Sequence, residues 1–337
     1  HMDMVCEKNS DTEFDFAKDP IKVKVEGDWV HAQGTTLGAD NGIGVAAALA
    51  VVDDESVVHG PLELLLTVDE ETGLTGAMGL DPALITGRRL INLDSEDDGV
   101  IFVGCAGGRN VSLTLPVETT DAPQWPAINI QVRGLRGGHS GLDIDKNRAN
   151  AVKVLALALD GLRQRFDLPV ASIEGGSAHN AIAREAHALC LHPPGTFDEV
   201  KEIIEDADHQ AQEQWGQVER ELTLHFSQAD RPSHVMTPAT SRRIVDLLLA
   251  LPHGPQAMSP DIPGLVETSN NLATVSSDGQ GVKVLLSARS SAGAALKLTG
   301  AHLPAIGALA GAEVTAHDGY PGWQPDMDSA MLAVARE

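Results

Sequence analysis

Residues 62–73 read LELLLTVDEETG, an apolar run that ends in two neighbouring glutamates, a threonine and a glycine. A short apolar run bounded by turn residues is typical of a buried strand, so a strand is predicted at 62–66. In an open α/β sheet, binding sites are built at the carboxyl ends of the strands. Glu70 and Glu71 stand at such an end, and two adjacent acids there suggest two tasks, binding a metal and moving a proton.

The composition narrows the class of protein. The chain has 337 residues, of which 42% are hydrophobic, enough for two domains with sizeable cores. Its formal net charge of −24 repels phosphate backbones, so nucleic acid is not expected as a partner. The same charge attracts cations, although solubility alone would also explain it.

The cysteines and the hydropathy pattern indicate a cytoplasmic protein. Cys6, Cys105 and Cys190 are far apart and form neither a disulfide framework nor a metal-type spacing. No apolar run approaches the roughly 18–20 residues of a membrane span, and no signal peptide is visible. A membrane partner is therefore not expected.

Two further segments place acids at similar positions. Residues 34–44, GTTLGADNGIG, lead into an apolar helix predicted at 45–52. A phosphate loop would need Gly-Lys-Ser/Thr, which is absent, so these glycines are expected to hold Asp40 at a tight strand-to-helix turn. Residues 89–94 are predicted to form another strand, which ends in Asp94, and 100–103 a third. Strands alternating with helices favour an α/β domain with a mostly parallel sheet.

The pattern changes after residue 110. Residues 111–115 and 128–132 alternate like strands of a sheet with one solvated face, and prolines lie between them. A helix is predicted at 150–165, and mixed strands and helices follow, which favours an α+β domain. We therefore expect a catalytic domain formed by residues 1–110 and 311–337, and an inserted domain formed by 111–310.

The polar residues at the strand ends of the first domain share one chemistry, and they are His1, Asp3, Asp40, Glu70, Glu71 and Asp94. Imidazole and carboxylates together suit Zn²⁺, Mn²⁺ or Co²⁺, and one carboxylate can bridge two metals roughly 3.5–4 Å apart. Each acid considered alone is more simply interpreted as a solvated side chain at the end of a strand. Because all of them occur at the same kind of position, a metal site is the better interpretation. One glutamate can act as the base while its neighbour binds metal, and Asp3 can orient His1.

These residues carry a family resemblance. The motifs at 1–3, 40–42, 70–73 and 94–96 resemble those of the co-catalytic zinc peptidases of the aminoacylase/carnosinase group, and within it the bacterial dipeptidases that cleave Xaa-His. Matching stretches at 34–44, 59–63, 104–108, 137–141, 180–182, 266–269 and 320–325 extend the likeness over essentially the whole chain. The resemblance implies a zinc-exopeptidase-like catalytic domain with an inserted lid and dimerisation domain.

The resemblance also implies roles for the strand-end residues. His1 and Asp94 would bind a first metal, Glu71 a second, and Asp40 would bridge both. Glu70 would be the general base that passes a proton from water to the leaving amine, and Asp3 would hold His1. Two divalent ions, foremost zinc with manganese or cobalt as alternatives, are thus the expected cofactors.

Three residues of the inserted domain receive expected roles as well. His139 would polarise the scissile carbonyl, within one chain or across a homodimer, although a turn histidine is the simpler interpretation without the resemblance. Arg289 would clamp the terminal carboxylate of the substrate, and a surface arginine ending a strand is the alternative. Asn180 would contact substrate.

The implied activity is metal-dependent hydrolysis of Xaa-His and other dipeptides. The alternatives are an N-acyl amino acid amidohydrolase of the same superfamily and a non-catalytic chain that kept the fold. The family uses a final His ligand from a C-terminal segment and sheet-forming residues before the His-Xaa-Asp strand. We therefore expect truncation at both ends, and a fragment that binds one metal weakly or is inactive.

Overall fold

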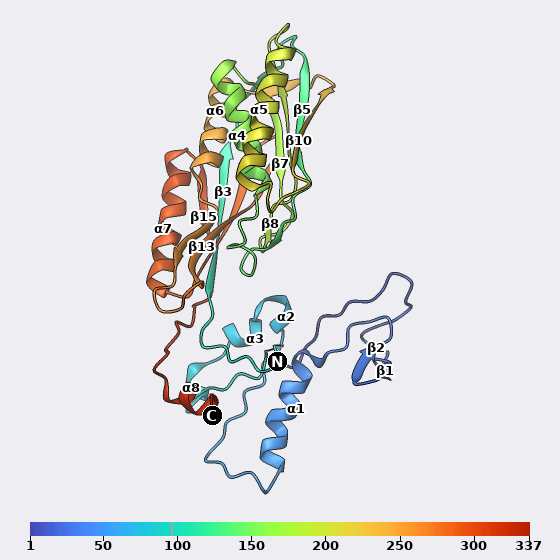
Figure 1. Ribbon diagram of the computed structural model, residues 1–337, viewed down its shortest axis with the longest axis vertical. Coiled ribbons are helices and arrows are strands. Elements are labelled where there is room, and N and C mark those ends of the chain that lie inside the picture. Colours follow the sequence, from blue (N-terminus) through green and yellow to red (C-terminus); the bar gives the residue numbers. More distant parts are fainter. Residues whose placement is uncertain (96) are drawn as a thin grey trace. The chain divides into compact units, whose positions relative to one another are not determined.

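A computed structural model describes residues 1–95 and 97–337, so Glu96 of the 94–96 motif lies outside the described residues. The chain forms two compact units, one of His1–Ile101 with Ser329–Glu337 and one of Phe102–Asp328 (Figure 1). Among the described residues, no helix is long and apolar enough to cross a membrane.

The first unit contains one hairpin, several helices and long segments without regular secondary structure. Its hairpin pairs β1 (Val23–Glu26) with β2 (Trp29–Ala32) in antiparallel fashion. The helices are α1 (Ala39–Asp53), α2 (Glu70–Gly73), α3 (Thr75–Met78), a 3-10 turn (Pro82–Leu84) and α8 (Ala330–Ala335).

The strands predicted at 62–66, 89–94 and 100–103 are not formed, and the mostly parallel sheet expected for the first domain is not found among the described residues. No described residue pairs with these segments in a ladder, and β1–β2 is the ladder described for the first unit. Their apolar side chains are exposed, as Leu90 at 78% and Ile91 at 72% illustrate. The apolar pattern marks segments suited to burial, but a strand also needs a neighbour about 4.8 Å away to pair with.

The second unit is organised by a nine-stranded sheet in which the pairings are antiparallel. Its order is β10-β5-β9-β7-β13-β14-β3-β15, with β12 also on β13. The strands are β3 (Gly107–Pro116), β5 (Ala127–Arg133), β7 (Val170–Gly175), β9 (Ala186–Leu191), β10 (Thr223–Ala229), β12 (Gly254–Met258), β13 (Val266–Ser277), β14 (Gly281–Ser290) and β15 (Glu313–Ala316).

Shorter pairs and four helices complete this unit. β4 (Thr119–Asp121) pairs with β11 (His234–Met236), and β6 (Gly138–His139) pairs with β8 (Ala181–Ile182). The helices that pack on the sheet in Figure 1 are α4 (Ala151–Arg165), α5 (Phe197–Trp215), α6 (Pro238–Ala250) and α7 (Gly293–Leu309). The α+β architecture expected for the second domain is therefore found.

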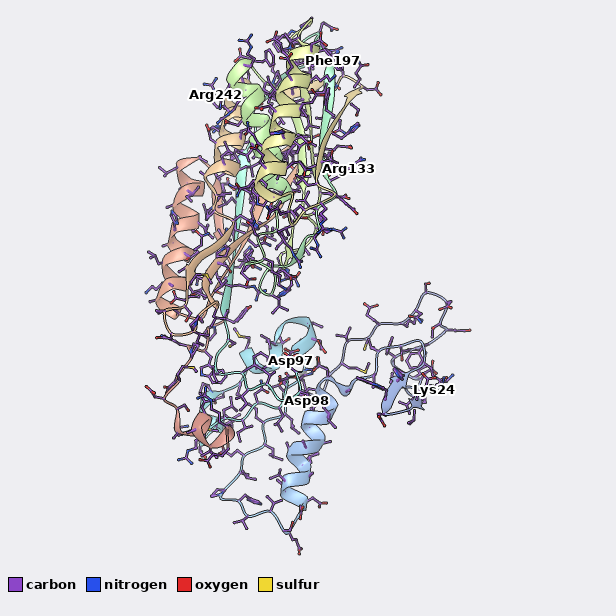
Figure 2. All side chains as sticks on the ribbon, viewed as in Figure 1. Lys24, Asp97, Asp98, Arg133, Phe197 and Arg242 are labelled. Carbon is purple, nitrogen blue, oxygen red and sulfur yellow. The ribbon has the colours of Figure 1, made fainter. Side chains whose placement is uncertain are left out.

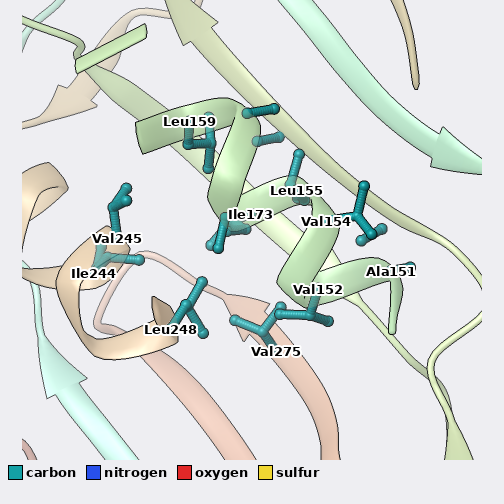
Figure 3. Packing of buried hydrophobic residues seen from close by; sticks show 14 of the residues in the cluster. Ala151, Val152, Val154, Leu155, Leu159, Ile173, Ile244, Val245, Leu248 and Val275 are labelled. Carbon is teal, nitrogen blue, oxygen red and sulfur yellow. The ribbon is translucent and has the colours of Figure 1, made fainter. Parts of the chain in front are cut away.

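The core of the second unit follows from the periodicity that predicted α4. Val152, Leu155 and Leu159 are fully buried, and Figure 3 shows them facing residues of α6 and of the sheet. Burial of one such side chain contributes about 1.5–3 kcal/mol. Charged side chains such as Arg133 and Arg242 are exposed on the outside (Figure 2).

The last strand differs from the domain boundaries expected from sequence. β15 pairs with β3, with Val314 opposite Leu113, so it belongs to the sheet of the second unit. Only Ser329–Glu337 group with the first unit. The physical reason is that β14 occupies only one edge of β3, which leaves the other edge for β15. The preceding helix α7 brings the chain there, because it packs so closely on β3 that a Cβ at Gly307 would lie 2.6 Å from the Leu113 side chain.

Candidate metal centre

The chain's first residues lie against the stretch that carries the glutamates. The Met2 backbone N–H donates to the Thr67 carbonyl at 3.0 Å, which sets His1 and Asp3 beside α2. Asp3 accepts from the Glu71 backbone N–H at 3.2 Å. His1 is only 8% exposed. This short contact therefore joins residues that are far apart in sequence.

The hydrogen bonds of His1 determine which ring nitrogen is available. Nδ1 lies 2.9 Å from the Asp3 carbonyl oxygen, which can only accept, so Nδ1 carries the hydrogen. The neutral ring then presents the lone pair of Nε2, the form in which histidine binds metal. The Asp3 carboxylate is farther from Nδ1, at 3.5 Å, so its backbone carbonyl makes the closer contact.

Carboxylates surround that nitrogen. Nε2 of His1 lies 3.2 Å from Asp40 Oδ1, 3.6 Å from Glu70 Oε2 and 3.6 Å from Asp94 Oδ1. Ligand atoms of His1, Asp40 and Asp94 all lie within 4.8 Å of one another, and so do those of His1, Glu70 and Glu71. The structure therefore brings the predicted metal-binding residues into one cluster.

A strained turn presents the two glutamates. Asp69 has a φ of 58°, in the left-handed region that most residues avoid. Its carboxylate accepts hydrogen bonds from the Thr72 hydroxyl at 2.5 Å and from the Thr75 hydroxyl. These bonds offset the strain and hold the start of α2, where Glu70 and Glu71 point to the cluster.

Glycines allow the approach of Asp40 and Asp94. Gly38, with a φ of 78°, precedes α1 and turns the chain so that Asp40 lies in the first turn of the helix. A Cβ at Gly44 would lie 2.4 Å from the Leu93 carbonyl oxygen. Only glycine therefore lets α1 approach the residue before Asp94.

The electrostatics of the cluster suit a cation. Burial raises the pKa of Glu70, and the negative charges of Asp94, Glu71 and Asp40 raise it further against the opposing effect of His1. Burial also raises the pKa of Asp94, with help from a hydrogen bond to Asp40. Burial alone would lower the pKa of His1, but the bond to Asp3 and the nearby carboxylates outweigh it and raise that pKa. Crowded carboxylates around one imidazole nitrogen are a donor set that fits a divalent ion.

The other predicted site residues lie in the second unit. Nδ1 of His139 accepts from the backbone N–H groups of Gly141 at 3.3 Å and Leu142 at 3.2 Å, so the ring hydrogen is on Nε2. Burial lowers the pKa of His139, and the charge of Arg289 lowers it further. A neutral His139 with an Nε2–H is a hydrogen-bond donor.

Asn180 has an exposed side chain, and its backbone carbonyl accepts from the Ser140 N–H at 2.8 Å. Sequence reasoning missed two participants. The Tyr320 hydroxyl accepts from Arg289 Nη1 at 3.1 Å, and Asp69 orders the turn of the glutamates. The Tyr-Pro-Gly-Trp motif at 320–323 and the Asp-Glu-Glu-Thr motif at 69–72 were the available signals.

Comparisons with known proteins show the family of the chain. Residues 130–219 match the model of a peptidase dimerisation domain of the M20 class. The whole chain is 39% identical over 338 aligned residues to the cytosol non-specific dipeptidase of Escherichia coli (strain K12), covering 70% of that protein. The chain belongs to the M20 family of peptidases.

A solved structure extends the likeness to three dimensions. The aminoacylhistidine dipeptidase from Vibrio alginolyticus is 38% identical, with a TM-score of 0.92 over 99% of this chain and 68% of that one. This match confirms the predicted fold class of a zinc-exopeptidase-like domain with an inserted dimerisation domain. M20 peptidases generally bind metal ions, and the donor cluster around His1 is in keeping with that.

Proposed function

We propose that this M20 peptidase is a metal-dependent dipeptidase that hydrolyses Xaa-His and other dipeptides, with Glu70 as general base. The observation that carries the proposal is the convergence of Asp40, Glu70 and Asp94 on Nε2 of His1 at 3.2–3.6 Å. The names of the similar proteins, a non-specific dipeptidase and an aminoacylhistidine dipeptidase, support the substrate class. They also favour it over N-acyl amino acids.

The cofactors in this proposal are two divalent ions, foremost zinc, with manganese or cobalt as alternatives. His1 and Asp94 would hold the first ion, Glu71 the second, and Asp40 both. Ions held there would supply Lewis acidity toward water and the scissile carbonyl. Asp3 keeps His1 in the tautomer that exposes Nε2, through the contact of its carbonyl with Nδ1 at 2.9 Å.

Glu70 moves the proton. Its carboxylate belongs to the cluster, yet it is a neighbour of Glu71 and can take a different role. It accepts a proton from the attacking water and delivers it to the leaving amine, so one group serves both halves of the reaction. Burial favours this exchange, because it brings the pKa of Glu70 closer to neutrality.

The second unit supplies further groups in this proposal. His139 donates its Nε2–H to the developing oxyanion, within the chain or across a homodimer. Arg289 pairs with the terminal carboxylate of the dipeptide, and Asn180 contacts the substrate backbone. The match to a dimerisation domain supports residues 111–310 as a lid and dimerisation domain. The name of the Escherichia coli relative supports a cytoplasmic location.

The test measures hydrolysis of alanyl-histidine and N-acetyl-histidine by the chain after EDTA treatment and after addition of Zn²⁺, Mn²⁺ or Co²⁺. We expect metal to restore cleavage of the dipeptide in preference to the N-acetyl compound. Preference for N-acetyl-histidine would instead indicate an amidohydrolase, and no cleavage with any metal would contradict the proposed activity.

Variants separate the two glutamates. Glu70→Gln is expected to lower kcat by at least about a hundredfold while bound metal, measured by mass spectrometry, is kept. Glu71→Ala is expected to lower metal content itself. The matched control is Glu55→Gln, an exposed acid of the same unit outside the cluster. Full activity of Glu70→Gln would remove Glu70 as the base.

A further inference from the structure

Arg289 is a half-buried guanidinium that lacks an acidic partner among the described residues. Its one hydrogen bond within that part of the chain runs from Nη1 to the Tyr320 hydroxyl at 3.1 Å. Its Nε is buried and has no acceptor. A buried guanidinium normally pairs with an anion, because removing its hydration is costly. The N–H groups of Arg289 that have no acceptor therefore indicate a binding site for an anionic ligand.

His139 places a second hydrogen-bond donor beside Arg289. A Cβ at Gly141 would lie 3.2 Å from Cε1 of His139 and 3.6 Å from Cδ of Arg289, so both side chains border the same small loop. The charge of Arg289 contributes to lowering the pKa of His139. Of the acids, Asp143 is the one that acts on His139, and its carboxylate is occupied by Lys146 at 2.7 Å and Arg148 at 2.9 Å.

Backbone hydrogen bonds between Gly108 and Tyr320 position Tyr320 beside Arg289. The Gly108 N–H donates to the Tyr320 carbonyl at 3.1 Å, and the Tyr320 N–H donates to the Gly108 carbonyl at 3.0 Å. A Cβ at Gly108 would lie 2.7 Å from the Tyr320 ring and hydroxyl, and one at Gly107 would lie 2.4 Å from the Gly322 nitrogen. The glycine pair that begins β3 thus leaves room for the segment that carries Tyr320.

The same segment is held at a second point. Cys105 and Trp323 exchange two backbone hydrogen bonds, each 2.9 Å long. Residues 105–108 and 320–323 therefore run side by side, and the aromatic ring has little freedom to leave Arg289. This accounts for two motifs, Gly-Cys-Ala-Gly-Gly and Tyr-Pro-Gly-Trp, to which the proposed reaction assigns no task.

We propose that Tyr320 is a specificity residue that, together with Arg289, selects substrates with a free terminal carboxylate. The phenol oxygen accepts from Arg289 and holds the guanidinium in place. The phenol hydrogen has no acceptor among the described residues, so it can donate to the carboxylate that pairs with the guanidinium. The Tyr320 hydroxyl and the Arg289 guanidinium then discriminate against a C-terminal amide, because its NH₂ group is itself a donor and cannot accept their hydrogen bonds.

The kinetic test of this proposal rests on the proposed dipeptidase activity, whereas the binding test below does not. The ratio of kcat/KM for alanyl-histidine to that for alanyl-histidine amide is expected to fall about tenfold in Tyr320→Phe, because one hydrogen bond to a charged group is lost. The ring is kept, so packing on Gly108 is preserved. The matched control is Ser112→Ala, which removes an exposed hydroxyl of β3 that bonds His317 at 2.7 Å, and it should leave the ratio unchanged. An unchanged ratio in Tyr320→Phe would overturn the proposal.

A binding experiment tests the same idea without catalysis. Tyr320 is the chain's one tyrosine, so a carbon-13 label at tyrosine Cζ yields a single resonance that reports its hydroxyl. In the EDTA-treated chain, we expect alanyl-histidine to shift this resonance, the amide to leave it in place, and Arg289→Gln to abolish the shift. Equal shifts with both ligands, or none with either, would refute the role of Tyr320. If the chain hydrolyses no dipeptide, the proposed function fails, and this resonance alone decides the role of Tyr320.

Discussion

Replacing Glu219 should destabilise the loop that carries His139. Glu219 is fully buried, and its two carboxylate oxygens accept from backbone N–H groups at both ends of that loop. Oε2 accepts from Arg136 at 2.8 Å, and Oε1 accepts from Ala149 at 3.1 Å. One side chain therefore ties the start of the loop to Ala149, two positions before α4 begins.

The magnitude follows from what Glu219→Ala leaves behind. Two backbone N–H groups lose their acceptor; the one of Ala149 is buried, and a buried group without a partner costs about 1–3 kcal/mol. The free energy of unfolding should therefore fall by roughly 1–3 kcal/mol. Glu219→Gln keeps one acceptor oxygen but turns an NH₂ toward the other N–H group, so a loss of similar sign and smaller size is expected.

Urea unfolding followed by tryptophan fluorescence measures this change. Trp215 of α5 reports the second unit, whereas Trp29 is already 71% exposed and should change little. The matched control is Glu221→Ala, an exposed acid two residues further along. Amide hydrogen exchange at Arg136 and Ala149 should accelerate in Glu219→Ala alone. A stability within about 0.5 kcal/mol of the control would refute the reasoning.

Two other predictions concern pH and the turn of the glutamates. Burial, followed by the charge of Lys153, lowers the pKa of His253 to about 4 from 6.5, so the folded state resists protonation that the unfolded state accepts. The contribution of His253 to the free energy of unfolding is thus complete above pH 6.5, and up to about 3 kcal/mol of it is lost as pH falls toward 4. Urea titrations at each pH should show a shallower decline of the unfolding free energy in His253→Gln than in the unchanged chain. Identical slopes for the two proteins would contradict this. Asp69→Ala removes the acceptor for Thr72 and should weaken Zn²⁺ binding, measured by calorimetry, about tenfold or more, whereas unchanged affinity would show that the turn holds without it.

Sequence reasoning worked best where local pattern and chemistry coincide. The periodicity of 150–165 predicted α4 with its buried face, and Asn150 caps its first turn by accepting from Val152 and Lys153. The acids proposed for one metal cluster do lie together around His1. By contrast, the strand predicted at 62–66 has no pairing partner among the described residues, because the apolar pattern of a segment does not say what lies beside it.

The sequence by itself determined the residue types of the centre, the helix periodicity and the family motifs, because these depend on side-chain chemistry and on neighbours a few positions away. Only the tertiary structure decided that β15 joins β3 and that Tyr320 holds Arg289. Both depend on close approaches between segments far apart in the chain. For Glu70 and Glu71, the sequence marked two adjacent acids, and the fold showed what places them, a turn held by Asp69 that faces His1.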